Sequence, residues 1–214
     1  PSNFVRDSLP PAVRAQKRCV MVPFGSPPAT VDETSARPPG NRLRVLFAGA
    51  LTQRKGLADL FAAMKLVDSK TVELVVMGSL LRPLQWYRKQ CADFTYEAPR
   101  AHPEVLRLMR SCDVFVLPSI VEGRALVQQE AMASGLPVIA TKNAGADDLI
   151  EDGKTGFLVP IRSPEAIAEK IIWCAANRGD LSGMGIAAQA RAAHQTWRGY
   201  GENVLAALRS LIGE

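Results

Sequence analysis

The stretch CDVFVLPSIVEGRALVQQEAMASG, residues 112–135, joins an apolar run to a segment of strong helix formers. Residues 112–117 have the composition of a buried strand, and a short loop follows them. Gly123 frees the backbone at the turn, and the residues after it are rich in Ala, Leu, Gln, Glu and Met. We therefore expect a strand, a loop and a helix that begins within one or two residues of Glu122 and ends at Gly135.

A helix that starts at the carboxyl end of a parallel strand is a seat for an anion, because unpaired N–H groups and a positive partial charge face the crevice. Glu122 would lie beside this seat, and Glu130 roughly 12 Å further along the axis at about 1.5 Å per residue. A nucleoside diphosphate sugar is long enough to touch both, with sugar hydroxyls at Glu122, diphosphate at the helix start and ribose at Glu130. Alternatively, neither glutamate binds a ligand: Glu122 is a charged loop residue and Glu130 a solvated helix residue. Two glutamates at this spacing also arise by chance.

Strand and helix signals alternate from Leu43 onward. The strand runs are nearly continuous Val, Leu and Phe, which indicates a parallel sheet that helices cover on both faces. The expected strands are 44–48, 72–77, 94–96, 113–117, 137–140 and 156–159. The expected helices are 57–67, 84–91, 104–110, 147–150, 164–177 and, in two or three pieces, 181–211. The predicted fold class is α/β, with a doubly wound, Rossmann-like parallel sheet.

A second candidate for phosphate contact is the loop GALTQRKG, residues 49–56, after the first strand. Gly49 allows a tight turn, and Arg54 and Lys55 bring two positive charges to the mouth of the strand. The spacing is neither GxGxxG nor a P-loop, which argues against a dehydrogenase or an ATPase. The alternative is that these cations are merely solvated. Residues 78–81 could supply an apolar wall for a nucleotide base.

Composition narrows the classes of ligand and compartment. The 214 residues carry a formal charge of +5, which suits an anionic ligand, an acidic membrane surface or nucleic acid. No basic run has interleaved aromatic residues, so a phosphate-bearing small molecule ranks above nucleic acid. The four cysteines stand singly, and His102 and His194 are isolated, so we expect reduced core thiols, structural histidines and no metal site. With no long apolar run, the predicted location is cytoplasmic.

The stretch from Asp113 to Ile171 resembles the donor half of the GT-B glycosyltransferases, in particular glycosyltransferase family 4 (group 1). That family carries a Glu, seven residues, Glu motif, which Glu122 and Glu130 match. Further blocks match in order along nearly the whole chain. The resemblance implies the C-terminal half of a GT-B enzyme of polysaccharide biosynthesis. It also implies transfer from a nucleotide diphosphate sugar that retains the anomeric configuration and uses neither metal nor cofactor.

The resemblance also assigns roles to residues. Those it implies for catalysis are Glu122 and Lys55, and those it implies for donor binding are Gly49, Arg54, Gly123, Arg124, Ala125, Leu126 and Glu130. Two positions depart from the family. Ala50 stands where the family has an arginine, which makes Arg54 the candidate replacement. Where the family has E-G-F-G, residues 122–125 are Glu, Gly, Arg and Ala, so Arg124 and Ala125 differ. We expect Arg124 to face solvent. The alternatives are that it contacts a phosphate or changes how the sugar fits.

The chain is expected to be part of a longer protein. Residues 1–18 resemble the end of an acceptor-binding domain and the crossing segment, residues 19–195 the donor domain, and residues 196–214 a C-terminal helix. The acceptor, a carbohydrate or a lipid-linked sugar, would bind to a missing N-terminal domain, so we expect this fragment alone to be inactive. Peripheral attachment of the full-length protein to a membrane is compatible with this reading. The alternatives are a sugar-nucleotide epimerase or phosphorylase of the same architecture and a non-catalytic nucleotide-binding module.

Overall fold

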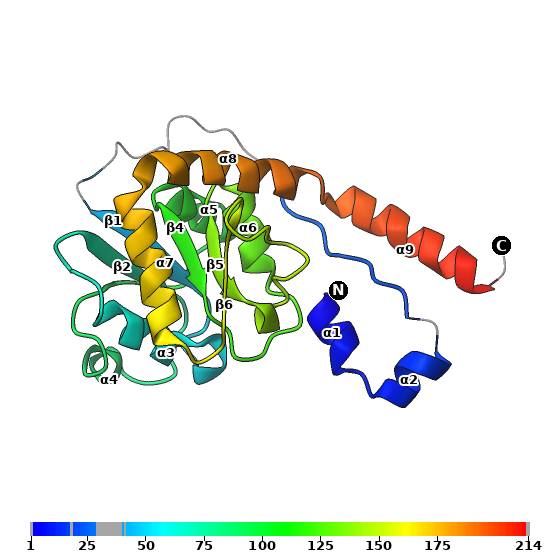
Figure 1. Ribbon diagram of the computed structural model, residues 1–214, viewed down its shortest axis with the longest axis horizontal. Helices are drawn as coiled ribbons and strands as arrows, with labels where there is room; N and C mark the ends of the chain where they lie inside the picture. The colour runs from blue at the N-terminus through cyan, green and yellow to red at the C-terminus, as the bar shows by residue number, and fades with distance from the viewer. Residues whose placement is uncertain (1, 18, 29–39, 41, 213–214) are drawn as a thin grey trace.

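A six-stranded parallel sheet forms the centre of the computed structural model, which describes residues 2–17, 19–28, 40 and 42–212 (Figure 1). The strands are β1 (Leu43–Ala48), β2 (Val72–Met77), β3 (Thr95–Glu97), β4 (Val114–Leu117), β5 (Val138–Thr141) and β6 (Gly156–Val159). Their order across the sheet is β3-β2-β1-β4-β5-β6, and every neighbouring pair is parallel. The predicted doubly wound α/β class is confirmed. The order reverses between β1 and β4, which is where such sheets hold their ligands.

Helices cover both faces of the sheet (Figure 1). Those of the sheet domain are α3 (Leu57–Met64), α4 (Leu84–Arg88), α5 (His102–Arg110), α6 (Leu126–Ala133), α7 (Pro164–Ala176) and α8 (Arg178–Ala193). Helices α3 and α7 pack on one another, as do α6 and α8, and α5 contacts α6. The terminal helices are α1 (Asn3–Ser8), α2 (Pro11–Gln16) and α9 (Trp197–Ile212), and two short 3-10 helices are η2 (Gln53–Lys55) and η3 (Lys142–Ala144).

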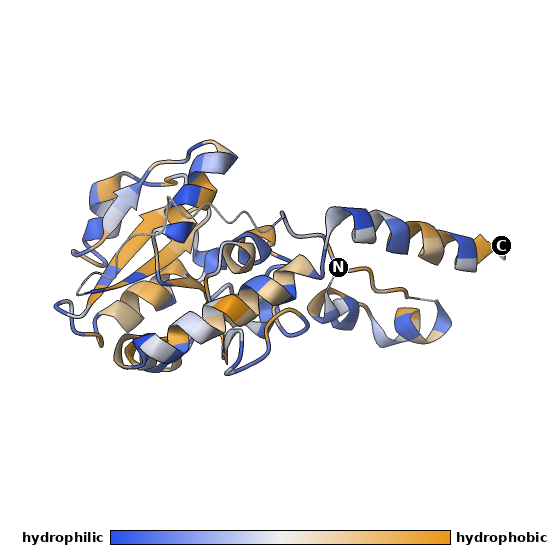
Figure 2. Cartoon of the chain, turned by 90° about the horizontal axis from the view of Figure 1, so that it is seen from above, coloured by the Kyte–Doolittle hydropathy of each residue, from blue (hydrophilic) through white to orange (hydrophobic). Residues whose placement is uncertain are grey.

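The core lies on the two faces of the central strands. Val45, Leu46 and Phe47 of β1 are fully buried, as are all four residues of β4. Figure 2 shows the strands of the sheet largely in orange, the colour of hydrophobic residues. Residues that alternate sides along a strand are buried in both directions, as expected for a parallel sheet between two helical layers.

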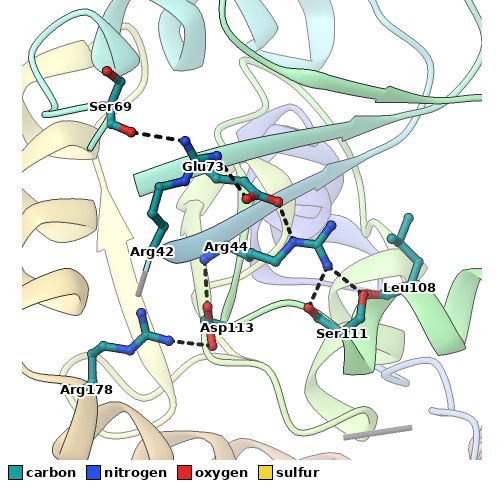
Figure 3. A network of polar contacts seen from close by, with 8 residues as sticks. All are labelled: Arg42, Arg44, Ser69, Glu73, Leu108, Ser111, Asp113 and Arg178. Carbon is teal, nitrogen blue, oxygen red and sulfur yellow. Dashed lines mark hydrogen bonds and ion pairs between the residues drawn. The ribbon is translucent and has the colours of Figure 1, made fainter. Parts of the chain in front are cut away.

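A polar network joins the amino ends of three strands (Figure 3). Arg44 Nε donates to Glu73 Oε1 at 2.6 Å, and Arg42 donates to Glu73 Oε2 at 3.0 Å. Asp113 accepts from the backbone N–H of Arg44 at 2.6 Å and from Arg178 at 3.1 Å. Burial would raise the pKa of Glu73, but the hydrogen bonds from the two arginines outweigh it, and the pKa is lowered. The network therefore ties β1, β2, β4 and α8 together at the edge opposite to their carboxyl ends.

Several predicted boundaries are wrong by a few residues. No helix forms at 147–150, where the chain makes turns. Helices α3 and α4 end three residues before the predicted ends, at Met64 and Arg88. Helix α5 begins at His102, two residues earlier than predicted, because a proline in its first turn suits a helix start. Residues 26–41 contain four prolines and few apolar residues, which predicts a surface connector, and most of them lie outside the described residues.

Three of the four cysteines are buried thiols, as expected, whereas Cys19 is exposed. Burial raises the pKa of Cys112 to about 11 and that of Cys174 to about 12, so both stay protonated at neutral pH. Within the described residues, no three His, Cys, Asp or Glu side chains gather as they would around a metal ion. In the same part of the chain, no helix has the length and apolar character needed to cross a membrane.

The terminal elements extend from one end of the sheet domain (Figure 1). Helix α9 runs outward from the end of α8, and Trp197 at its start stacks on Phe24 with ring centroids 6.3 Å apart. Helix α1 instead reaches back to the sheet domain, where Ser2 Oγ donates to the carbonyl of Gly123. The division of the chain at residues 18 and 195 stays a prediction.

We expect Gly56→Ala to destabilise the fold by about 2 kcal/mol, because Gly56 has φ +73° and a Cβ there would collide with the carbonyl oxygen of Pro118. Urea unfolding measures the change. Gly183→Ala is the control, since Gly183 lies in α8 with open space around it, and alanine should stabilise that helix by up to about 1 kcal/mol. Equal unfolding midpoints for the two variants would contradict the assigned strain.

Candidate functional site

The loop between β1 and α3 carries the first cation of the site. Gly49 follows β1 directly, and its N–H donates to the carbonyl of Met77 at 3.0 Å. The loop then forms η2, in which the Thr52 side chain accepts from the N–H of Lys55 at 3.3 Å. Gly56 ends η2 in the left-handed conformation and starts α3. These local bonds hold Lys55 at the carboxyl edge of the sheet.

Glu122 and Lys55, both predicted to be catalytic, form an ion pair between Lys55 Nζ and Glu122 Oε2. Their side chains are only 12% and 15% exposed. Arg54 lies on the outside of the pair, 53% exposed, with one guanidinium nitrogen 3.4 Å from the same carboxylate oxygen. The structure therefore brings the two predicted phosphate loops together, with one sheltered cation and one exposed cation around a single carboxylate.

The loop that holds Glu122 is not the first turn of a helix, so the helix begins at least two residues later than predicted. The N–H of Glu122 donates to the carbonyl of Asn143 at 2.8 Å, and the N–H of Ala125 donates to that of Ala144 at 3.4 Å. These partners belong to the segment after β5, and they hold residues 122–125 in a loop that is not helical. Helix α6 begins at Leu126, and no side chain caps it, because its N-cap is Ala125. An uncapped start leaves helix N–H groups for a ligand.

Arg124 does not face solvent, so that prediction is wrong. Its side chain is fully buried and forms an ion pair with Asp148, which is itself 17% exposed. The backbone carbonyl of Asp148 also accepts from Arg191 at 3.1 Å. Asp148 is thus the partner of a buried guanidinium. The pairing joins the Glu122 loop to the turns after η3.

Glu130 pairs with His102, which was expected to be an isolated, structural histidine. His102 Nε2 lies 3.2 Å from Glu130 Oε1, with the side chains 55% and 22% exposed. His102 is the first residue of α5, which packs against α6. Nothing in the sequence links two residues 28 positions apart, so only the fold reveals that this histidine is not isolated. His194 ends α8 and takes no part in the cleft.

The cleft has a volume of about 450 Å³. Its lining residues are Ala48, Gly49, Ala50, Lys55, Met77, Val105, Glu122, Arg124, Ala125, Leu126, Val127 and Glu130. All the predicted site residues line it except Arg54, which reaches the site through Glu122, and Gly123, whose carbonyl accepts from Ser2. The apolar wall comes from Met77 and Val105 rather than from residues 78–81, of which Leu81 lies in a neighbouring cavity.

The cleft therefore combines three elements in one groove. A lysine and a helix start can stabilise negative charge, an acid beside them can accept hydrogen bonds, and a second acid lies one helical turn further along. At roughly 1.5 Å per residue, Glu130 is about 6 Å along the axis from the start of α6.

The comparisons with known proteins agree on one family. The family model for group 1 glycosyl transferases matches residues 42–177. The D-inositol 3-phosphate glycosyltransferase of Mycobacterium tuberculosis is 30% identical over 191 residues, which are 87% of this chain and 35% of that protein. The chain spans roughly a third of the length of the curated relatives it matches.

Solved structures share the fold. HepE from Anabaena, in a crystal structure with UDP and glucose, matches with a TM-score of 0.71 and 26% identity, over 79% of this chain and 49% of that one. Sucrose-phosphate synthase from Thermosynechococcus elongatus matches with a TM-score of 0.81 and 23% identity, over 99% of this chain and 57% of that one. These likenesses confirm the Rossmann-like domain of a GT-B architecture.

We expect Asp148→Asn to destabilise the protein by about 2 kcal/mol, because the carboxylate that pairs with the buried Arg124 is neutralised. The double variant with Arg124→Met should be less destabilised, by at least about 1 kcal/mol, than the sum of the two single variants. Urea unfolding of the two single variants and the double variant gives this coupling.

The control for that cycle is Glu151→Gln. Glu151 forms exposed ion pairs with Arg191 at 3.1 Å and with Lys154 at 2.8 Å, so Glu151→Gln should change the free energy of unfolding much less than Asp148→Asn. Strictly additive effects at Arg124 and Asp148 would show that their pairing contributes nothing to stability.

Proposed function

Because the chain belongs to the group 1 glycosyltransferases, we propose that its cleft binds a nucleotide diphosphate sugar as the donor of glycosyl transfer. One observation carries this proposal. Lys55, Glu122, the uncapped start of α6 and Glu130 lie in a single groove at the switch point of the sheet. Such a series of groups matches a ligand with a charged middle and two hydroxyl-rich ends.

The diphosphate would lie at the start of α6. The N–H groups of this helix and the ammonium of Lys55 would stabilise the negative charge that develops as the sugar leaves. Arg54 would replace the arginine that Ala50 does not provide, since it is exposed and lies within 3.4 Å of Glu122. In this proposal these fixed charges perform the task that a divalent metal performs in other enzymes.

The two acids would hold the ends of the donor. Glu122 would accept hydrogen bonds from the transferred sugar, and Glu130 from the ribose hydroxyls. His102 is already in contact with Glu130, and it would orient the carboxylate toward the groove. The structure of HepE with UDP and glucose supports a uridine nucleotide as the first one to test.

The proposed reaction is a transfer that retains the anomeric configuration, with an acceptor bound by an N-terminal domain. The acceptor would be a carbohydrate or a lipid-linked sugar. The proposed location is the cytoplasm, with which three buried free thiols agree, and the full-length protein would attach peripherally to a membrane.

We expect Glu130→Ala to weaken binding of both UDP and uridine by roughly 1 to 3 kcal/mol, because its carboxylate accepts hydrogen bonds from ribose. Lys55→Ala should weaken the binding of UDP and leave the binding of uridine unchanged, because the ammonium contacts the diphosphate. Calorimetric titration of UDP, GDP, ADP, dTDP and uridine measures these effects and identifies the preferred base.

The matched controls are Glu169→Ala and Lys154→Ala. Both side chains are about 70% exposed and lie outside the cleft, so their removal should not change nucleotide affinity. An unchanged affinity in Glu130→Ala would remove the ribose assignment, and equal losses for UDP and uridine in Lys55→Ala would remove the diphosphate assignment.

The full-length protein should transfer labelled sugar to an acceptor with retention, read from the anomeric coupling in the NMR spectrum of the product, whereas this fragment alone should not. Conversion of one free sugar nucleotide into another without acceptor would instead indicate an epimerase. Binding without any turnover in the full-length protein would indicate a nucleotide-binding module.

A further inference from the structure

A second cavity, of about 430 Å³, lies between α3, α4 and the β1–α3 loop. Its lining residues are Leu51, Thr52, Gln53, Leu57, Ala58, Phe61, Ala62, Lys65, Leu81, Arg82, Trp86, Tyr87 and Gln90. None of them lines the donor cleft. The two cavities are nevertheless neighbours, because residues 51–53 border this one and Lys55, on the same loop, borders the other.

The inner wall of this cavity is apolar. Leu51, Leu57, Phe61 and Tyr87 are each at most 3% exposed. The Tyr87 hydroxyl donates to the carbonyl of Leu51 at 3.0 Å and accepts from the N–H of Leu81 at 3.1 Å. Its hydrogen bonds are thereby used within the protein, and the ring presents carbon to the cavity. A recess of this size with aliphatic and aromatic walls is typical of a ligand pocket.

The mouth exposes large apolar side chains. Leu81 is 65% exposed and Trp86 is 49% exposed, and they flank the recess from the β2–α4 loop and from α4. Exposure of this degree at the edge of an apolar recess leaves hydrophobic surface that a ligand can cover. A tryptophan at the mouth also places an aromatic ring where a ligand passes from water to the apolar wall.

The mouth is positively charged. Lys65, directly after α3, and Arg82, two residues before α4, both line the cavity, and its lining contains no carboxylate. Among the described residues, neither cation forms an ion pair with a carboxylate. An apolar recess with two such cations at its edge is complementary to a molecule that has an apolar body and an anionic head.

We propose that this cavity binds a single alkyl chain with a phosphate headgroup, taken up as a monomer. The chain would lie against Phe61, Tyr87 and Trp86, and the phosphate would accept hydrogen bonds from Lys65 and Arg82. A monomer fits better than a flat bilayer surface, because the most apolar residues lie at the inner wall and not on a protruding face. The proposal does not depend on the identity of the sugar donor.

The probe is dodecyl phosphate below its critical micelle concentration, with binding followed by tryptophan fluorescence and calorimetry. We expect saturable binding and a fluorescence change that Trp86→Phe removes, since Trp173 and Trp197 lie outside the cavity. Lys65→Gln and Arg82→Gln should each weaken binding about tenfold, and Lys154→Gln, a lysine far from the cavity, should not.

Two further arms distinguish the occupants. Ala62→Phe, which fills the recess, should abolish calorimetric binding, and dodecyltrimethylammonium should bind at least about tenfold more weakly than dodecyl phosphate. Equal affinity for the cationic probe, or undiminished binding in the filled variant, would overturn the proposal. Binding to anionic vesicles without uptake of the monomer would show instead that the mouth of the cavity binds a membrane surface. Self-association that Ala62→Phe abolishes, without uptake of the probe, would assign it to a second copy of the chain.

Discussion

The site depends on the contact between the loops that follow β1 and β4. Because these strands are neighbours, their carboxyl ends lie side by side, and the N–H of Ile120 donates to the carbonyl of Arg54 at 2.9 Å. Gly56 permits the approach, since it brings the first loop against Pro118, where a Cβ would collide with a backbone carbonyl. With the loops in contact, Lys55 and Glu122 meet although they are 67 positions apart in the chain.

The resulting ion pair is better explained by ligand binding than by stability. Removing two charges from water costs several kcal/mol, and their attraction rarely exceeds that cost. Lys55 and Glu122 are both less than one-fifth exposed, and the cleft they border is open. In the proposed function, a ligand that brings hydroxyls to the acid and phosphate to the ammonium would supply the partners that water no longer provides.

The sequence predicted what depends on burial and missed what depends on distant partners. Strands buried on both faces are continuous apolar runs, so β2 and β6 were located to the residue. The predicted helix start falls within residues 122–125, yet hydrogen bonds to carbonyls after β5 hold these residues in a loop. The pairing of Arg124 with Asp148 and the contact of His102 with Glu130 were missed for the same reason, because the partners are far apart in the chain. Local propensity cannot predict hydrogen bonds and ion pairs between loops that only the order of the strands brings together.

The two cations of the β1–α3 loop differ in a way that suits them to different tasks. Lys55 is held by its cap and by Glu122, so its charge is already in place before a ligand arrives. Arg54 is half exposed, and its contacts with Glu122 and with the carbonyl of Val121 are both 3.4 Å long. Such weak contacts are easily exchanged for a phosphate, whose geometry suits a guanidinium. Ala50 lines the cleft with only a methyl group, so in the proposed function the guanidinium for the phosphate comes from Arg54.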